Sequence, residues 1–138
     1  MNSKELIITF IKTSCAVNDM LAQNLKPFGI SLQQFNVLRI LRGQNGVPAN
    51  LSTVQELMVN KMSNTTRIID KLIDKNFVAR DICKENRRKI ELFITKDGLS
   101  ILKEIDPIVD LTEDKMVGHL SATDKEKFVS YMKQLKVN

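Results

Sequence analysis

One stretch of the sequence, residues 61–98, constrains the fold most, because the spacing of its apolar residues changes partway along. Over residues 63–75 they recur at the three- and four-residue steps of a helix. Residues 77–82 and 89–94 read instead as strands, and the second alternates with the period of two that is typical of a half-buried hairpin. The segment between them is polar apart from Cys83. The stretch therefore predicts a helix followed by a β-hairpin with a charged tip.

The same stretch carries the whole net charge of the chain. Residues 61–90 hold nine basic and four acidic side chains, a local charge of +5, whereas the remaining residues carry 12 of each. Such a field suits a polyanion, because neutralised phosphates release their condensed counterions. Basic surfaces also bind membranes and acidic proteins, and many charge runs are merely solvated. Charge alone therefore leaves nucleic acid as one of several interpretations.

Long amphipathic helices are predicted at both ends of the chain. The first spans residues 3–26, and its length of ~35 Å exceeds what one small domain needs to cover its core, which suggests a partner subunit. After Thr95 the pattern is helical again, although Pro107 should kink or split the helix. A last helix is expected over residues 121–136. Residues 91–138 have a net charge of −2, so we expect them to face away from a polyanion and to pair with the first helix across a two-fold axis.

Capping patterns predict two shorter helices in between. Ser31 and Gln34 form a capping box for the second helix of the chain. Ser52 and Gln55 repeat the pattern for a short third helix that runs to about residue 59. The residues expected to face inward from this third helix are Val54, Leu57 and Met58.

Together the elements predict a mainly α fold with a small β-hairpin wing, which is a winged helix-turn-helix flanked by dimerisation helices. We expect an N-terminal dimerisation helix in residues 1–30, the winged DNA-binding region in residues 31–98 and C-terminal dimerisation helices in residues 99–138, all in one compact chain. In such folds the first turn of the second helix meets base edges, and here it offers only short hydrogen-bonding side chains. These are Ser63, Asn64, Thr65 and Thr66. A simple N-cap at Ser63 and two surface threonines would also explain this turn.

Residues 62–98 resemble the signature of the MarR family of bacterial transcription regulators. That signature has a Ser-x-x-Thr-Arg-x-x-Asp-x-Leu recognition helix, an Asp-x-Arg wing and a Thr-x-x-Gly at the start of the next helix. The corresponding positions here are Ser63, Thr66, Arg67, Asp70 and Leu72, then Asn86 and Arg88, then Thr95 and Gly98. The chain departs from the pattern at Asn86, where the family has aspartate, and at Asn76, which replaces a glycine after the recognition helix. Asparagine tolerates the left-handed conformation expected at residue 76.

The resemblance implies a homodimeric regulator, most simply a repressor, that binds a pseudo-palindromic operator with half-sites ~10 base pairs apart. Many members release DNA when a small aromatic or anionic ligand binds between the dimerisation helices and the winged region. We expect base contacts from the first turn of the recognition helix and phosphate contacts from the basic residues of the helix and wing. The DNA-binding candidates are Lys61, Ser63, Asn64, Thr65, Thr66, Arg67, Lys71, Lys84, Arg87, Arg88 and Lys89.

Composition argues against several other classes of protein. The chain of 138 residues is 43% hydrophobic, which suits one globular domain, and no apolar run reaches the ~20 residues of a membrane span. The first residues lack the pattern of a signal peptide, so a cytoplasmic location is expected. Neither a phosphate-binding loop nor a nucleophile motif indicates an enzyme. One histidine, His119, and two distant cysteines do not make a metal site, and no cofactor is predicted.

Two alternative functions stay open. The winged helix could be a protein-binding module that uses its long apolar helices for a different partner. The chain could also be a thiol-based redox sensor, because some members of the family sense peroxide through a cysteine in the first helix. Cys15 is interpreted as a buried small apolar residue, and Cys83 as an exposed residue at the wing.

Overall fold

The computed structural model describes residues 1–60 and 64–137. In chain order the elements are α1 (Ser3–Leu25), the short 3₁₀ helix η1 (Lys26–Phe28), α2 (Leu32–Gly43), α3 (Leu51–Leu57), α4 (Thr65–Asp74), β1 (Val78–Ile82), β2 (Ile90–Ile94), α5 (Lys96–Val117) and α6 (Ala122–Gln134). This mainly helical chain with one antiparallel hairpin confirms the predicted fold class. Two of the predicted site residues, Lys61 and Ser63, lie outside the described residues.

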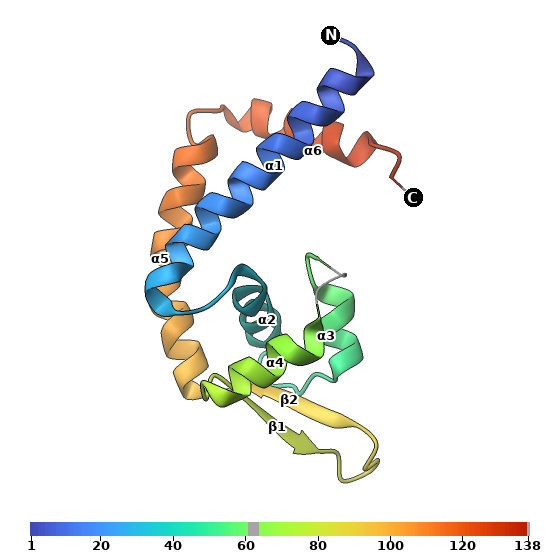
Figure 1. Ribbon diagram of the computed structural model, residues 1–138, viewed down its shortest axis with the longest axis vertical. Coiled ribbons are helices and arrows are strands. Elements are labelled where there is room, and N and C mark those ends of the chain that lie inside the picture. Colours follow the sequence, from blue (N-terminus) through green and yellow to red (C-terminus); the bar gives the residue numbers. More distant parts are fainter. Residues whose placement is uncertain (61–63, 138) are drawn as a thin grey trace.

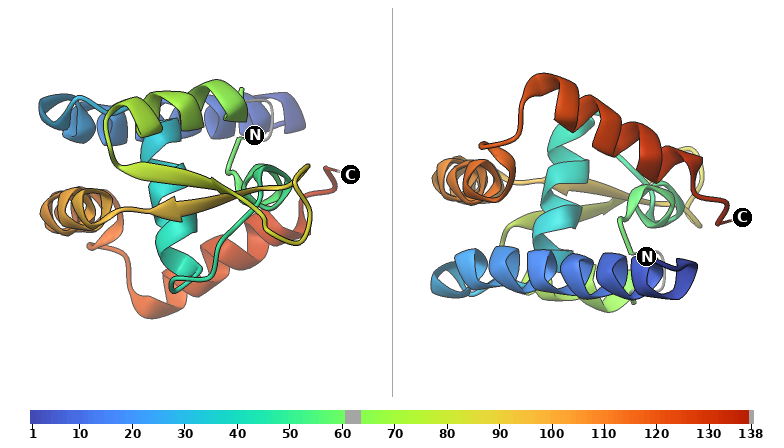
Figure 2. Two further views of the ribbon diagram at one scale, coloured as in Figure 1. Left: turned by 90° about the horizontal axis from the view of Figure 1, so that it is seen from below. Right: turned by 90° about the horizontal axis from the view of Figure 1, so that it is seen from above.

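The long helices α1 and α5 lie side by side and carry the smaller winged region at one end (Figure 1). An amide-to-hydroxyl hydrogen bond joins them, from Asn24 Nδ2 to Thr112 Oγ1 at 2.7 Å. Seen from above, α1 and α6 run along opposite sides of the molecule, with α2 and α3 visible between them (Figure 2). The two ends of the chain are therefore built from helices that extend away from the winged region.

The hydrophobic core lies where α2 packs against α4, α5 and the hairpin. Its fully buried side chains come from every one of these elements and from the end of α1, and include Leu25, Leu38, Leu72, Val78 and Leu102. The hairpin pairs Val78 with Ile94 at its base and Ile82 with Ile90 near its tip. Because Leu92 also pairs with Ala49 through two backbone hydrogen bonds of 2.7 and 3.1 Å, the loop before α3 covers the other edge of β2.

Most helix ends lie where the sequence predicts them. The capping box of Ser31 and Gln34 is formed in both directions, and Ser121 caps α6. α5 begins after Thr95 as expected, but it continues through Pro107 as one helix of 22 residues, so the predicted split is not observed. The left-handed conformation predicted for Asn76 is confirmed by its φ of 64°.

The prediction for α3 needs two corrections. Its cap is Asn50, whose side chain accepts the Thr53 N–H at 2.8 Å, so the helix begins one residue before Ser52 rather than after it. The chain becomes extended at Met58 and turns that side chain into the core, whereas Leu57 stays 53% exposed. The inward residues of this segment are therefore Val54 and Met58.

Candidate nucleic-acid interface

The N-terminal turn of α4 is capped by Asn64 rather than Ser63. Its side-chain oxygen accepts the backbone N–H of Arg67 at 3.2 Å, which satisfies one of the unpaired donors of the first turn. Asn64, Thr66, Arg67 and Lys71 are all exposed along the helix. This face of α4 therefore presents two short polar side chains at its start and two cations further along.

Thr65 is a correction to the predicted base-reading set. Its side chain is buried, with a relative exposure of 5%, although it stands between two exposed neighbours. It is the first residue of α4, one position before the exposed Thr66, and successive residues of a helix point about 100° apart. The turn of the helix that exposes Thr66 thus directs Thr65 into the protein, and Thr65 is not placed to meet a base edge.

The C-terminal end of α4 is fixed by a Schellman motif around Asn76. The N–H of Phe77 bonds to the Leu72 carbonyl at 3.0 Å, and the N–H of Asn76 bonds to the Ile73 carbonyl at 2.9 Å. Asn76 supplies the left-handed residue that this motif needs. The helix therefore ends abruptly and sends the chain directly into β1.

The Thr-x-x-Gly motif at residues 95–98 joins this turn to α5. Thr95 Oγ1 accepts the Gly98 N–H at 3.0 Å as the helix cap and donates to the Asn76 carbonyl at 2.7 Å. The Thr95 N–H donates to the Phe77 carbonyl at 3.0 Å. Gly98 is buried against that carbonyl, because a Cβ at this position would lie 2.4 Å from the Phe77 oxygen. The motif thus has a structural role, which is to hold the end of the recognition helix against the start of α5.

The wing is a short hairpin whose tip carries four exposed cations. They are Lys84, Arg87, Arg88 and Lys89. At the tip, Asn86 Oδ1 accepts the backbone N–H of Arg88 at 3.1 Å, and the Asn86 carbonyl accepts that of Lys89 at 2.9 Å. The amide thus bonds the backbone of Arg88. Among the described residues, no ion pair or hydrogen bond engages the guanidinium of Arg88.

The recognition helix and the wing lie on one side of the molecule. Viewed from below, α4 runs above the hairpin and the two strands extend toward the tip (Figure 2). An exposed ion pair at 3.9 Å, Arg80 with Asp70, links β1 to α4, and such pairs contribute at most about 1 kcal/mol. Every described candidate other than Thr65 is exposed on these two elements.

Sequence reasoning missed the part that α2 contributes to this surface. Ser31 and Gln33 line a hollow of about 280 Å³ together with Asn64, Arg67 and Lys71 of α4. The N-terminal turn of α2 therefore lies beside the recognition helix. The capping box at residue 31 predicted a helix start, but the packing of that start against α4 depends on contacts distant in sequence.

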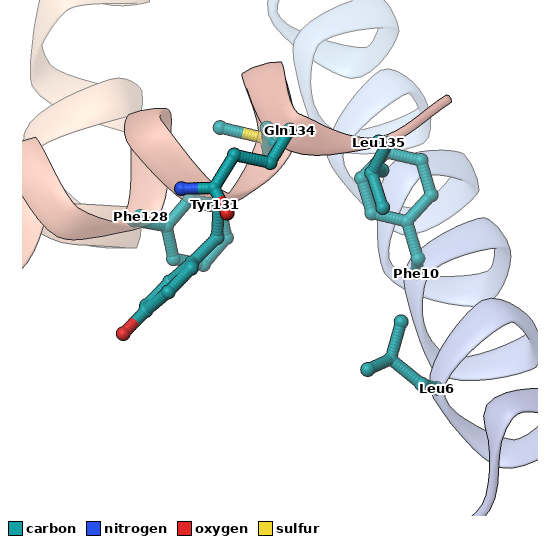
Figure 3. A pocket seen from close by; sticks show the side chains of 7 residues that line it. Leu6, Phe10, Phe128, Tyr131, Gln134 and Leu135 are labelled. Carbon is teal, nitrogen blue, oxygen red and sulfur yellow. The ribbon is translucent and has the colours of Figure 1, made fainter. Parts of the chain in front are cut away.

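A second exposed surface is apolar and lies between α1 and α6. Leu6 and Phe10 from α1 and Phe128, Tyr131 and Leu135 from α6 line an open groove of about 450 Å³ (Figure 3). Further apolar side chains of α1, α5 and α6 are exposed beside it, among them Ile7, Ile11, Leu111, Val117 and Val129. These helices therefore present a large apolar face that this single chain does not cover.

The two cysteines differ from their predicted environments. Cys15 is exposed on α1, so its interpretation as a buried residue is wrong for the isolated chain, because it falls on the outer side of a helix with one neighbour along its length. Cys83 at the base of the wing tip is half-buried rather than exposed. His119 is exposed at the end of α5. Across residues 1–60 and 64–137, no three His, Cys, Asp or Glu side chains gather where they could hold a metal ion.

None of the helices in the described part of the chain is both long and apolar enough to span a membrane.

Comparison with known proteins identifies the same region as the defining one. The family model of the MarR family matches residues 30–90, which run from the start of α2 to the first residue of β2. The HTH-type transcriptional regulator MhqR of Bacillus subtilis is 24% identical over 136 residues, which cover 99% of this chain and 92% of that protein.

Solved structures share the whole fold. A MarR-like transcription regulator from Bacillus cereus superposes with a TM-score of 0.87 at 21% identity and covers 99% of both chains. BpsR of Bordetella bronchiseptica superposes with a TM-score of 0.81 at 18% identity, over 94% of this chain and 97% of that one. The flanking helices and the winged region thus occur together in these proteins as they do here. Members of the family are transcription regulators and not enzymes. With its matched winged region and this shared architecture, the chain belongs to the MarR family and is a transcriptional regulator with a DNA-binding winged helix.

Proposed function

We propose that the protein is a homodimeric repressor that binds a pseudo-palindromic operator in the cytoplasm and is released from it by a small ligand. The observation that carries the proposal is the joint exposure of the polar first turn of α4 and the basic wing tip on one side of the fold. An α-helix fits the major groove of DNA, and a narrow minor groove attracts arginine.

Each element has a separate role in this proposal. Asn64 and Thr66 read base edges, because their short side chains both donate and accept hydrogen bonds. Arg67 and Lys71 contact phosphates and fix the register of the helix on the duplex. The wing reaches the neighbouring groove or backbone through its cations, which are Lys84, Arg87, Arg88 and Lys89.

The apolar face of α1, α5 and α6 supports the homodimer. Large exposed apolar patches are rare on monomers and mark interfaces. Phe128 is 54% exposed and lies in the same groove as Phe10, which is 42% exposed. Burial of this face against a second copy would place two recognition helices on one duplex, as a two-fold operator requires.

Release by a ligand is supported by one of the structural relatives. DNA binding by BpsR of Bordetella bronchiseptica is regulated by 6-hydroxynicotinic acid. We extend this behaviour to the present chain as part of the proposal, with a small aromatic or anionic compound as the effector. A panel of aromatic carboxylates added to the protein–DNA complex tests it, and dissociation at a saturable concentration is the expected result.

The central experiment is a selection of bound duplexes from random DNA, followed by titration of the selected site at several salt concentrations. The selected site should contain two related half-sites. Arg88→Ala should weaken binding and reduce the slope of log K against log salt by about 0.9, the value for one phosphate contact. Lys115→Ala, which removes an exposed charge near the far end of α5, is the matched control and should leave the slope unchanged. An affinity that does not vary with salt would rule out the electrostatic basis of the proposal.

A further inference from the structure

Lys75, at the C-terminal end of the recognition helix, is hydrogen-bonded to the protein itself. Its ammonium group donates to the backbone carbonyl of Gly29 and lies 3.4 Å from Oε1 of Gln34. Gly29 ends the 3₁₀ turn that follows α1, and Gln34 is the buried partner in the capping box of α2. One side chain thus connects the end of α4 to the junction between α1 and α2.

The next residue connects the same helix end to α5. Asn76 Nδ2 donates to Asp97 Oδ2 at 2.9 Å, and the Asn76 carbonyl accepts the Thr95 hydroxyl at 2.7 Å. Asp97 lies in the first turn of α5, where a carboxylate is favoured by the helix dipole. Two consecutive residues therefore fasten the C-terminal end of α4 to α5 on one side and to the α1–α2 junction on the other.

We propose that Lys75 is a positioning residue for DNA binding, which sets the angle of α4 relative to the long helices α1 and α5 and does not neutralise a phosphate. The inference rests on the proposed DNA-binding function. Lysine has three donors on its ammonium group, and here they are directed to protein oxygens. Lys71, one turn earlier, is exposed, and its ammonium makes no hydrogen bond or ion pair within the described part of the chain. The two lysines thus carry the same charge on the same helix but differ in what holds them.

The position of the link explains its effect. Base contacts come from the first turn of α4, and the ten-residue helix is ~15 Å long, so Lys75 fixes the end opposite to the one that reads DNA. A small change of angle at the fixed end displaces the first turn, and displacements of about 1 Å are enough to weaken well-oriented contacts. Loss of the link should therefore lower the affinity for the operator while the number of phosphates contacted stays the same.

The test compares Lys75→Met with Lys71→Met by titrating the selected operator at several salt concentrations, at a temperature where both variants are folded. Lys71→Met should reduce the salt slope by about 0.9, as expected for one lost phosphate contact. Lys75→Met should weaken binding several-fold at each salt concentration while the slope changes by less than half as much. A slope reduction equal to that of Lys71→Met would identify Lys75 as a phosphate contact, and an unchanged affinity would leave it only a stabilising role; either result overturns the proposal.

A second measurement separates failure of this inference from failure of the proposed function. Amide hydrogen exchange in the absence of DNA reports on the N–H groups of Asn76 and Phe77, which bond to α4 carbonyls. In Lys75→Met they should exchange faster, whereas in Lys71→Met they should be unchanged. If the wild-type protein bound no duplex, the proposed function would fail whatever the exchange showed. If exchange in Lys75→Met matched the wild type, the link would not hold the helix end.

Discussion

Replacement of Gly98 by alanine should destabilise the protein, because the space beside its α-carbon is occupied by backbone. A Cβ would lie 2.4 Å from the Phe77 carbonyl oxygen and 2.7 Å from Cγ1 of Ile94. Since carbon–oxygen contacts are normally ~3.3 Å or longer, the backbone has to move by roughly 0.9 Å. The Phe77 carbonyl is not free to move, because it accepts the Thr95 N–H at 3.0 Å next to the cap of α5.

The magnitude follows from three contributions. Overpacking of this kind costs about 1–3 kcal/mol, and a lost hydrogen bond between Thr95 and Phe77 costs about 0.5–1.5 kcal/mol more. Alanine is better than glycine in a helix by about 0.5–1 kcal/mol, which offsets part of this. The net loss should be about 1–3 kcal/mol, and the melting temperature of a chain of 138 residues should fall by roughly 3–10 °C.

Thermal unfolding at one fixed protein concentration measures this, because association makes the melting temperature depend on concentration. Gly43→Ala is the matched control, since Gly43 also ends a helix but a Cβ there meets nothing within 4 Å. It should leave the melting temperature unchanged or raise it slightly. If Gly98→Ala melted at or above the wild-type temperature, the argument from close packing would be refuted.

Two further predictions concern the proposed surfaces. Thr66→Ala should alter the bases preferred in a selection of bound DNA, whereas Thr65→Ala should lower the melting temperature and leave the preference unchanged, because only Thr66 is exposed. Phe128→Glu should shift the protein from dimer to monomer in sedimentation analysis, because it places a charge in the apolar groove. Val47→Glu, at a loop residue that is 63% exposed, should leave the dimer intact, and dissociation by both variants would show that the groove has no special part in assembly.

Local signals in the sequence were sufficient for the elements of the fold. The change of apolar period across residues 61–98 predicted α4 and the hairpin to within two residues at each end that the structure describes. Asn76 and the capping box at Ser31 were predicted correctly, because a left-handed residue and a reciprocal cap each depend on a few adjacent positions. The grouping of α1 with α5 followed from the length and amphipathic pattern of both helices.

Errors arose where burial depends on residues distant in the chain. Thr65 and Thr66 are the same amino acid in adjacent positions, and only the packing of α4 makes one buried and the other exposed. Likewise the sequence offered both Asn50 and Ser52 as caps for α3, and the structure selects Asn50, which follows directly on the pairing of Ala49 with Leu92. The role of Lys75 was not predictable from charge, because the ammonium group finds its oxygens 41 and 46 residues earlier in the sequence.

The wing of this protein is held differently from the arrangement that the family signature suggests. Because Asn86 bonds the backbone N–H of Arg88, its amide shapes the turn without engaging the guanidinium. An aspartate at this position could accept the same bond, but it would add a negative charge two residues from Arg88. That charge would attract the guanidinium and repel the phosphates of DNA.

Asn86→Asp should therefore keep the melting temperature while it lowers both the affinity for the operator and the salt slope. Asn86→Ala, which removes the side-chain acceptor without adding charge, should lower the affinity with little change in slope, because only the order of the tip is lost. Titration of both variants on the same operator distinguishes charge from geometry. Tighter binding by Asn86→Asp would mean that a charged pair orders the wing arginine more than it competes with DNA, which would contradict the role inferred for the amide.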